Sequence, residues 1–333
     1  MTPISRLRGL AALPLVTIIA LTSCSAGADA SASASSTPFT LAAHTVTTDQ
    51  GEVAVPADPQ TIVVLNYALA GYLYDMDVPV AATISEDTAV AGAYSDFWAE
   101  DAEADGTQFV SWSNDGFDLE AILALQPDLI IGGGIGFPLY LATQAYADLS
   151  AIAPTVLVSG TLDDWQEQYD FLANDVFERG EVYDEALAAY DARVAEVKES
   201  ITPPPTPAAF LSLTADQTAY VLIEDRGLPQ VFASVGIEPA ELYATGQYEP
   251  YTSGGDSFEL STEQVGQVLT QPTLFVTGFN GADVDVATLE QNSVWASLPA
   301  FQSGNAYDLP YWVYRGDYDE TMALLDLIEE MFG

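Results

Sequence analysis

The chain has 333 residues, with 49 acidic against 7 basic side chains, a formal net charge of −42 at pH 7, one histidine and one cysteine. Hydrophobic residues make up 49% of it, which is too many for a disordered acidic segment. So few bases argue against a nucleic-acid partner, and one cysteine excludes a disulfide scaffold. One histidine leaves little for a catalytic triad or a histidine-rich metal site, so we expect no enzyme. The length suggests two domains of ordinary size.

Residues 1–23 have the pattern of an export signal. Two arginines, Arg6 and Arg8, precede an apolar run that ends in the tetrapeptide LTSC at Cys24. The run is shorter than the roughly 20 residues that a membrane-spanning helix needs. The tetrapeptide resembles a bacterial lipobox, which implies that Cys24 is diacylated and becomes the first residue of the mature chain. An ordinary signal in which Cys24 is incidental is the alternative.

Residues 24–38 are rich in Ser, Ala, Gly and Thr, which is typical of a flexible tether. We therefore expect a protein that is held on the outer face of the cell membrane by the lipid on Cys24 and does not cross the membrane. Removal of the signal leaves five bases against 49 acids. A solvated acidic surface, adapted to a salty or acidic medium, is expected. A calcium-binding patch is the rival, but no segment has the Asp-x-Asp-x-Asp-Gly spacing of a calcium loop.

Residues 39–180 are expected to form an N-terminal α/β lobe. Short β-branched runs alternate there with amphipathic stretches, which is typical of a mainly parallel sheet. Strands are predicted at residues 61–65, 128–131 and 155–158, and helices at residues 67–75, 119–125 and 138–148.

A long helix is predicted next, at residues 181–202. This segment is rich in helix formers and is ended by the prolines of Pro203–Pro207. About 20 helical residues span roughly 30 Å, which is enough to connect two lobes. Alternation resumes over residues 203–333, which predicts a C-terminal α/β lobe. The expected fold class is therefore α/β, with two Rossmann-like lobes joined by one long helix and a ligand cleft between the lobes.

A repeat within the sequence supports two related lobes. The segment Phe117–Glu120 leads through a predicted helix to a strand that begins after Pro127, and Phe258–Glu263 leads in the same way to a strand that begins after Pro272. The repeat is weak in identity but consistent in layout. Chance similarity is the alternative.

Three segments resemble the iron–siderophore substrate-binding proteins of ABC importers. They are LEAILALQPDLII at 119–131, LSAIAPTV at 149–156 and WASLPAFQSGNAY at 295–307. The resemblance runs from about Val46 to Phe332. It implies an extracytoplasmic binding protein that captures a ferric siderophore between its lobes and delivers it to a permease driven by an ATPase. It also implies small lobe movements, a largely preformed site and a monomer, with ferric iron carried in the ligand and no metal or cofactor held by the protein itself.

The resemblance further implies a role for two acidic residues. In this family a surface glutamate on each lobe pairs with arginines of the permease, and by position Glu120 and Glu263 match those glutamates. Charge-assisted pairs of this kind would fix the orientation of docking. Each carboxylate also suits the N-terminus of its helix. The Glu263 assignment is the less secure, because its distance to the following proline differs from that of Glu120 by two residues.

Candidate ligand-binding residues follow the carboxyl ends of the predicted strands or lie on nearby loops, where open α/β sheets bind ligands. Aromatic walls suit the organic shell of a siderophore. The aromatic candidates are Tyr67, Tyr94, Trp112, Phe137, Tyr251, Phe279 and Trp312. For any single one of them, packing in the core is the alternative, and it is the expected role of Trp98 and Trp295.

Cationic candidates are scarce, because only Arg226 and Arg315 lie away from the long helix once the signal is removed. Arginine presents a fork of donors to carboxylate, hydroxamate or catecholate oxygens. Two arginines in so acidic a chain suit a neutral or cationic chelate better than a tris-catecholate complex with about three negative charges. The favoured ligand is therefore a hydroxamate siderophore.

Other ligands of the same class remain open. Haem binding usually needs an axial His, Tyr or Met, and His44 lies close to the tether, whereas a tyrosine ligand is not excluded. Cobalamin is a further alternative. From a different class, a cell-surface adhesion module would show no saturable binding of a small molecule. A hydrolase is disfavoured because no Gly-x-Ser-x-Gly motif is present.

Overall fold

The computed structural model describes residues 43–86, 92–279 and 282–333, apart from the side chain of Arg315. Leu41–Gly333 form one compact unit. The predicted signal, the lipid-modified Cys24 and the tether lie outside the described residues.

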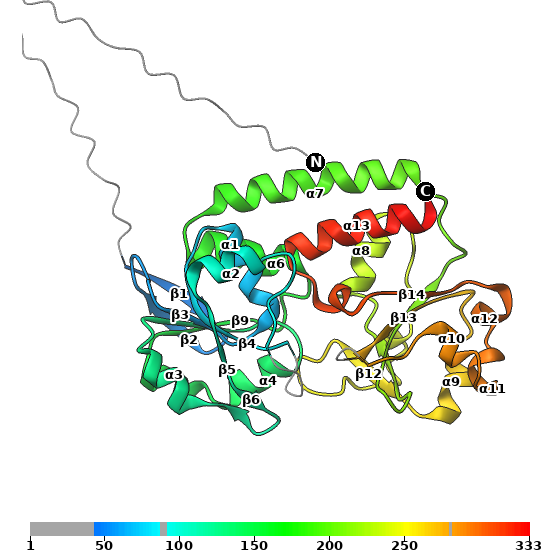
Figure 1. The fold of residues 1–333 in the computed structure, drawn as a ribbon, viewed down its shortest axis with the longest axis horizontal. Helices are drawn as coiled ribbons and strands as arrows, with labels where there is room; N and C mark the ends of the chain where they lie inside the picture. The colour runs from blue at the N-terminus through cyan, green and yellow to red at the C-terminus, as the bar shows by residue number, and fades with distance from the viewer. Residues whose placement is uncertain (1–42, 87–91, 280–281) are drawn as a thin grey trace, which may run out of the picture. The chain divides into compact units, whose positions relative to one another are not determined.

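A five-stranded parallel sheet forms the centre of the first lobe, with strand order β5-β4-β3-β8-β9. Strands β3, β8 and β9 of this sheet are buried along their whole length, which explains their uninterrupted hydrophobic runs. The strands are β3 (Ile62–Val64), β4 (Val80–Ile84), β5 (Gln108–Val110), β8 (Leu129–Gly133) and β9 (Thr155–Val158). The helices are η1 (Tyr67–Leu69), α1 (Ala70–Asp75), α2 (Ala99–Asp105), α3 (Leu119–Leu125), α4 (Phe137–Gln144) and α5 (Tyr146–Ile152) (Figure 1).

Two small antiparallel ribbons accompany this sheet, and neither was predicted. The first pairs β1 (His44–Thr48) with β2 (Gly51–Val55), and its buried valines join the core. The second pairs β6 (Trp112–Ser113) with β7 (Gly116–Phe117).

A second five-stranded sheet, with strand order β12-β11-β10-β13-β14, forms the centre of the second lobe. Strands β10, β13 and β14 are parallel, whereas β11 runs antiparallel to both of its neighbours, β10 and β12, so this sheet is mixed. The strands are β10 (Ala208–Leu213), β11 (Ala219–Leu222), β12 (Ser257–Leu260), β13 (Thr273–Gly278) and β14 (Ala306–Asp308). The helices are α8 (Leu228–Ser234), η3 (Tyr243–Thr245), α9 (Thr262–Val268), α10 (Val286–Leu289), α11 (Ser293–Ala296), α12 (Pro299–Ser303), η5 (Tyr311–Arg315) and α13 (Tyr318–Phe332).

The two sheets have the same order of strands, which gives the sequence repeat a structural basis. In each sheet the fourth strand in chain order, β8 or β13, lies beside the first strand, β3 or β10. It follows the helix of the sequence repeat, α3 or α9. The expected α/β fold with two related lobes is confirmed.

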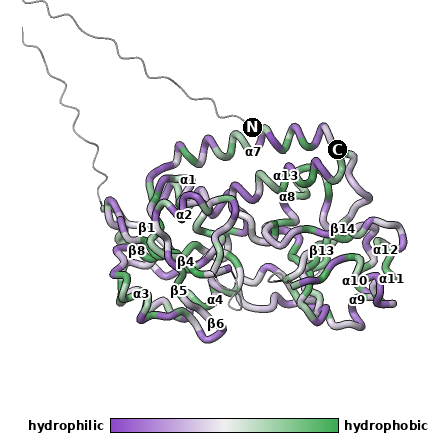
Figure 2. The backbone as a smooth tube through the Cα atoms, viewed as in Figure 1, coloured by the Kyte–Doolittle hydropathy of each residue, from purple (hydrophilic) through white to green (hydrophobic). Residues whose placement is uncertain are grey.

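One long helix, α7 (Gly180–Ser200), connects the lobes after α6 (Trp165–Asp170) and a π-helix over Phe171–Val176. It runs alongside α13 of the second lobe (Figure 1). Arg193 of α7 forms ion pairs with two carboxylates of α13. Its Nη2 lies 2.7 Å from Asp326 Oδ1 and 2.5 Å from Glu329 Oε2. Hydrophilic and hydrophobic residues alternate along α7 (Figure 2), as expected for a helix that covers a core with one face.

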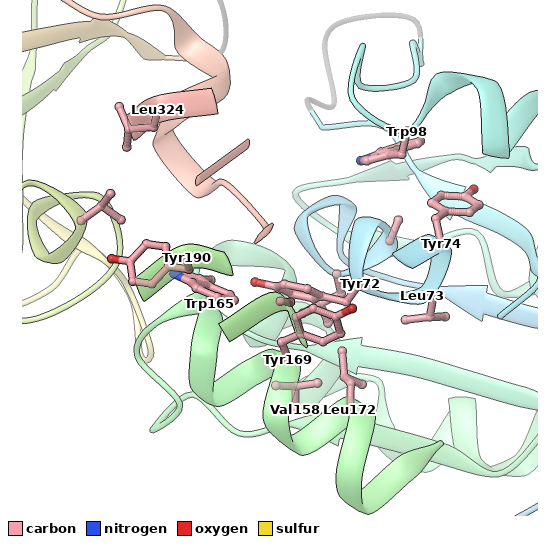
Figure 3. Packing of buried hydrophobic residues seen from close by; sticks show 14 of the residues in the cluster. Tyr72, Leu73, Tyr74, Trp98, Val158, Trp165, Tyr169, Leu172, Tyr190 and Leu324 are labelled. Carbon is pink, nitrogen blue, oxygen red and sulfur yellow. The ribbon is translucent and has the colours of Figure 1, made fainter. Parts of the chain in front are cut away.

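One hydrophobic core extends through both lobes. It contains Ile131 of the first sheet and Phe275 of the second, with Trp165 of α6 and Tyr190 of α7 between them. The Trp165 and Tyr190 rings pack edge to face with centroids 5.0 Å apart (Figure 3). A shared core of this kind couples the lobes more firmly than a helical linker alone. Trp98 and Trp295 are buried, as predicted for core residues.

Candidate ligand-binding cleft

A cavity of about 50 Å³ lies between the lobes. Side chains of the first lobe and of the second both line it, among them Tyr72, Trp165, Arg226, Asp256, Tyr314 and Glu320. Pockets for small organic ligands are usually about 300–1,000 Å³. The cleft is therefore closed at this place in the structure, and the expectation of a largely preformed site stays a prediction.

Contacts across the cleft explain the closure. The Gly136 amide of the first lobe donates to the Gly254 carbonyl of the second at 3.1 Å. The Phe97 and Trp312 rings meet edge to face with centroids 5.1 Å apart. Ser95 Oγ donates to Glu320 Oε1 at 2.8 Å. A bulky ligand can enter only where contacts of this kind are broken.

The glycine-rich stretch after β8 allows this close approach. Gly136 has φ = +90° and Gly254 has φ = +73°, a region of backbone conformation that favours glycine. A Cβ atom on Gly254 would lie 2.5 Å from Leu139 Cδ2 of the first lobe. In this closed structure these glycines bring backbone against backbone.

The aromatic candidates of the first lobe belong to two clusters. Tyr67 and Tyr94 both pack on Trp98, with ring centroids 5.0 and 6.0 Å away. The Tyr67 hydroxyl donates to the Ala93 carbonyl at 3.2 Å, and burial raises its pKa, so it is a neutral donor. Phe137 and Trp112 instead pack against the core of the first lobe, and Trp112 Nε1 donates to the Ser85 carbonyl at 2.8 Å.

The aromatic candidates of the second lobe are closer together. Phe279 lies between Tyr220 and Tyr314, with ring centroids 6.0 and 6.1 Å away, and Tyr251 meets Tyr220 at 6.3 Å. Trp312 makes the contact across the cleft described above. None of the seven aromatic candidates lines the cavity itself.

Arg226 is the predicted residue that lines the cavity. Its Nη1 lies 3.6 Å from Asp163 Oδ1 of the first lobe and donates to the Gly255 carbonyl at 3.3 Å. Arg315 lies in η5, and its side chain is outside the described part of the chain.

Several cavity residues were missed from the sequence. Trp165 and Asp164 follow the carboxyl end of β9, so the strand-end rule that selected Arg226 would also have found them. Glu320 and Tyr72 lie on helices, where no local pattern marks them as facing the other lobe.

Buried carboxyl groups gather where α13 meets α1. Asp317 and Glu320 are 1% and 6% exposed, and Oδ2 of Asp317 has no hydrogen-bond partner among the described residues. Burial raises the pKa of Asp317 and of Glu320, and it raises the pKa of Asp75 on α1 to about 8. Besides the acidic residues on the surface, the chain therefore has a cluster of carboxyl groups whose ionisation is disfavoured by burial.

The two predicted docking glutamates occupy equivalent places. Glu120 is the second residue of α3 after the cap Asp118, and Glu263 is the second residue of α9 after the cap Ser261. Both side chains are exposed. Both helices lie at the edge of the fold opposite α7 (Figure 1). The two-residue difference in the distance to the following proline arises beyond the helices, and the docking role of both glutamates stays a prediction.

Within the described ranges, no group of three or more His, Cys, Asp or Glu side chains could hold a metal ion. A search of the same residues for a helix long and apolar enough to cross a membrane gives none.

Known proteins resemble this chain in sequence and in fold. The ferric enterobactin-binding periplasmic protein FepB of Escherichia coli O6:H1 is 28% identical over 86% of this chain and 90% of its own. The iron(3+)-hydroxamate-binding protein FhuD of Bacillus subtilis is 26% identical over 99% of both chains. The crystal structure of holo-ViuP has the same fold, with a TM-score of 0.73 at 21% identity over 87% of this chain and 95% of that one.

These relatives are solute-binding proteins, so the prediction that the chain is not an enzyme is confirmed. The family model described as periplasmic binding protein matches residues 62–311, which is more than half of the chain. The protein therefore belongs to the periplasmic binding protein family.

Proposed function

We propose that this protein captures a ferric siderophore of the hydroxamate class between its lobes and delivers it to the permease of an ABC importer. Relatives whose names state a ferric siderophore support the general class of ligand. They include both an enterobactin binder and a hydroxamate binder, so they do not choose between the two chemistries.

The charge of the cavity carries the choice of hydroxamate. Two carboxylates, Asp164 and Asp256, line it against Arg226 among the described side chains, and burial raises the pKa of the third acidic residue, Glu320, which disfavours a charge there. Arg226 is itself paired with Asp163. A tris-catecholate complex, with about three negative charges, would meet more acid than base there, whereas a neutral or cationic hydroxamate complex would not.

Delivery rests on Glu120 and Glu263. Their equivalent positions on α3 and α9 give each lobe one exposed carboxylate for a permease arginine. The lipid on Cys24 would keep the protein at the membrane surface, where that encounter takes place.

A titration of tryptophan fluorescence tests the ligand. The exported chain, without residues 1–24, is mixed with ferrioxamine, ferrichrome, a ferric tris-catecholate, ferric citrate, hemin and cobalamin. We expect saturable quenching at the lowest concentrations with a hydroxamate complex. Tighter binding of the tris-catecholate would overturn the choice of hydroxamate, and tighter binding of hemin or cobalamin would move the protein to another ligand class. Saturation by none of them would favour an adhesion role.

A further inference from the structure

Asp163 and Arg226 face each other across the cleft. Asp163 lies between β9 and α6 in the first lobe, and Arg226 lies between β11 and α8 in the second. Asp163 makes two contacts there, because its carbonyl accepts from the Gly227 amide at 3.0 Å and its Oδ1 lies 3.6 Å from Arg226 Nη1. The backbone contact holds the carboxylate beside the guanidinium independently of the charge on the side chain.

The remaining contacts of Arg226 fix its guanidinium at the cavity. Nη1 donates to the Gly255 carbonyl at 3.3 Å, and Nε lies 3.5 Å from Asp225 Oδ1. The Arg226 side chain is 18% exposed, whereas that of Asp225 is 68% exposed. Two carboxylates thus approach one guanidinium, one from the opposite lobe and one from the solvent side of its own lobe.

The pair with Asp163 is loose. Its 3.6 Å separation is longer than a charge-assisted hydrogen bond, and Oδ1 of Asp163 is buried with no hydrogen-bond partner among the described residues. Burial raises the pKa of Asp163 even though Arg226 acts in the other direction. The Asp163 side chain is itself 34% exposed, so a carboxylate held with such poor geometry is readily replaced by an acceptor that fits the guanidinium better.

We propose that Asp163 determines which charge class of ferric siderophore the cleft accepts. The inference rests on the proposed function. The carboxylate acts as an internal anion that occupies Arg226, so the anionic oxygens of a ligand must displace it into a cavity already rich in carboxyl groups. A neutral or cationic complex binds without displacing it. Asp163 thereby selects against anionic chelates.

Two variants that remove one negative charge separate this role from a general charge effect. Asp163→Asn keeps the size of the side chain and the backbone contact to Gly227. Asp225→Asn removes the exposed carboxylate from the same guanidinium. Calorimetric titrations with a ferric tris-catecholate and with ferrioxamine, at one salt concentration, give the four affinities to compare with those of the unmodified chain.

We expect Asp163→Asn to tighten binding of the tris-catecholate about tenfold and to leave ferrioxamine within about twofold, whereas Asp225→Asn changes both little. Equal effects of the two variants, or a loss of both ligands on Asp163→Asn, would overturn the inference. Thermal unfolding shows whether each variant is folded. If Asp163→Asn does not fold, Asp163→Ser replaces it in the same titrations. If the unmodified chain binds no ferric siderophore, the proposed function falls as well; if it binds one and selectivity does not move, only this inference falls.

Discussion

Replacing Glu120 and Glu263 by arginine in one chain should abolish delivery of the ligand and leave ligand affinity unchanged. Both carboxylates are exposed at the second residue of equivalent helices, away from the cavity between the lobes. Two reversed charges would face permease arginines with repulsion in place of attraction. The helices themselves would lose only about 0.3–1 kcal/mol each from the unfavourable dipole interaction. Uptake of radioactive iron by cells that carry the variant as their only copy measures the effect.

Glu100→Arg is the matched control for this experiment. Glu100 is also exposed and is also the second residue of a helix, α2, which lies near α1 and away from α3 (Figure 1). We expect uptake with this variant to equal that with the unmodified protein. Normal uptake by the double variant, or equal loss with Glu100→Arg, would contradict the docking role.

The second large effect is a fall in stability as the pH rises from 5 to 8. Burial raises the pKa of Asp75 to about 8 from an ordinary value of 3.8. Below about pH 4 the group is protonated in both the folded and the unfolded chain. Between pH 4 and 8 the unfolded chain loses this proton while the folded chain keeps it, so ionisation favours unfolding. Three further acidic residues lie at the start of α13, namely Asp317, Asp319 and Glu320. Burial raises their pKa values as well, so their ionisation also favours unfolding as the pH rises.

Asp75→Asn should remove part of this dependence. The asparagine resembles the protonated acid, so the free energies of unfolding should match only below about pH 4, and the advantage of the variant should grow by about 3–4 kcal/mol between pH 5 and pH 8. Asp77→Asn, an exposed change two residues away, should leave the slope as it is. Urea unfolding at the two pH values measures both. The same slope for both variants would show that Asp75 is not kept protonated by the fold.

Periodicity was sufficient for much of the architecture. Residues 119–125 are helical as predicted, and the proline run after Ser200 does follow the end of the connecting helix. In β2, Val53 and Val55 alternate with exposed residues, a pattern that is typical of a half-buried strand. The pattern is short, and β2 was not predicted. The reversed direction of β11 depends on which strands meet in the sheet, and no local pattern carries that information.

The site was harder to predict for the same reason. Arg226 was found because it follows the end of a strand, but its partner Asp163 comes from a segment 63 positions away in the sequence, and only the fold brings the two together. Asp75 and Asp317 resemble ordinary surface acids in the sequence. The full burial of Asp317 and the partial burial of Asp75 result from the packing of α13 against α1, which depends on the whole chain.

The most direct test of siderophore capture between the lobes is a crystal structure of the exported chain with its tightest ferric ligand, with iron located by anomalous scattering. We predict iron between residues 134–137 of the first lobe and residues 251–256 of the second, where Gly136 and Gly254 meet in the closed structure. That pair would then be separated by the ligand. Iron on the outer surface, with the Gly136–Gly254 hydrogen bond intact, would contradict the account.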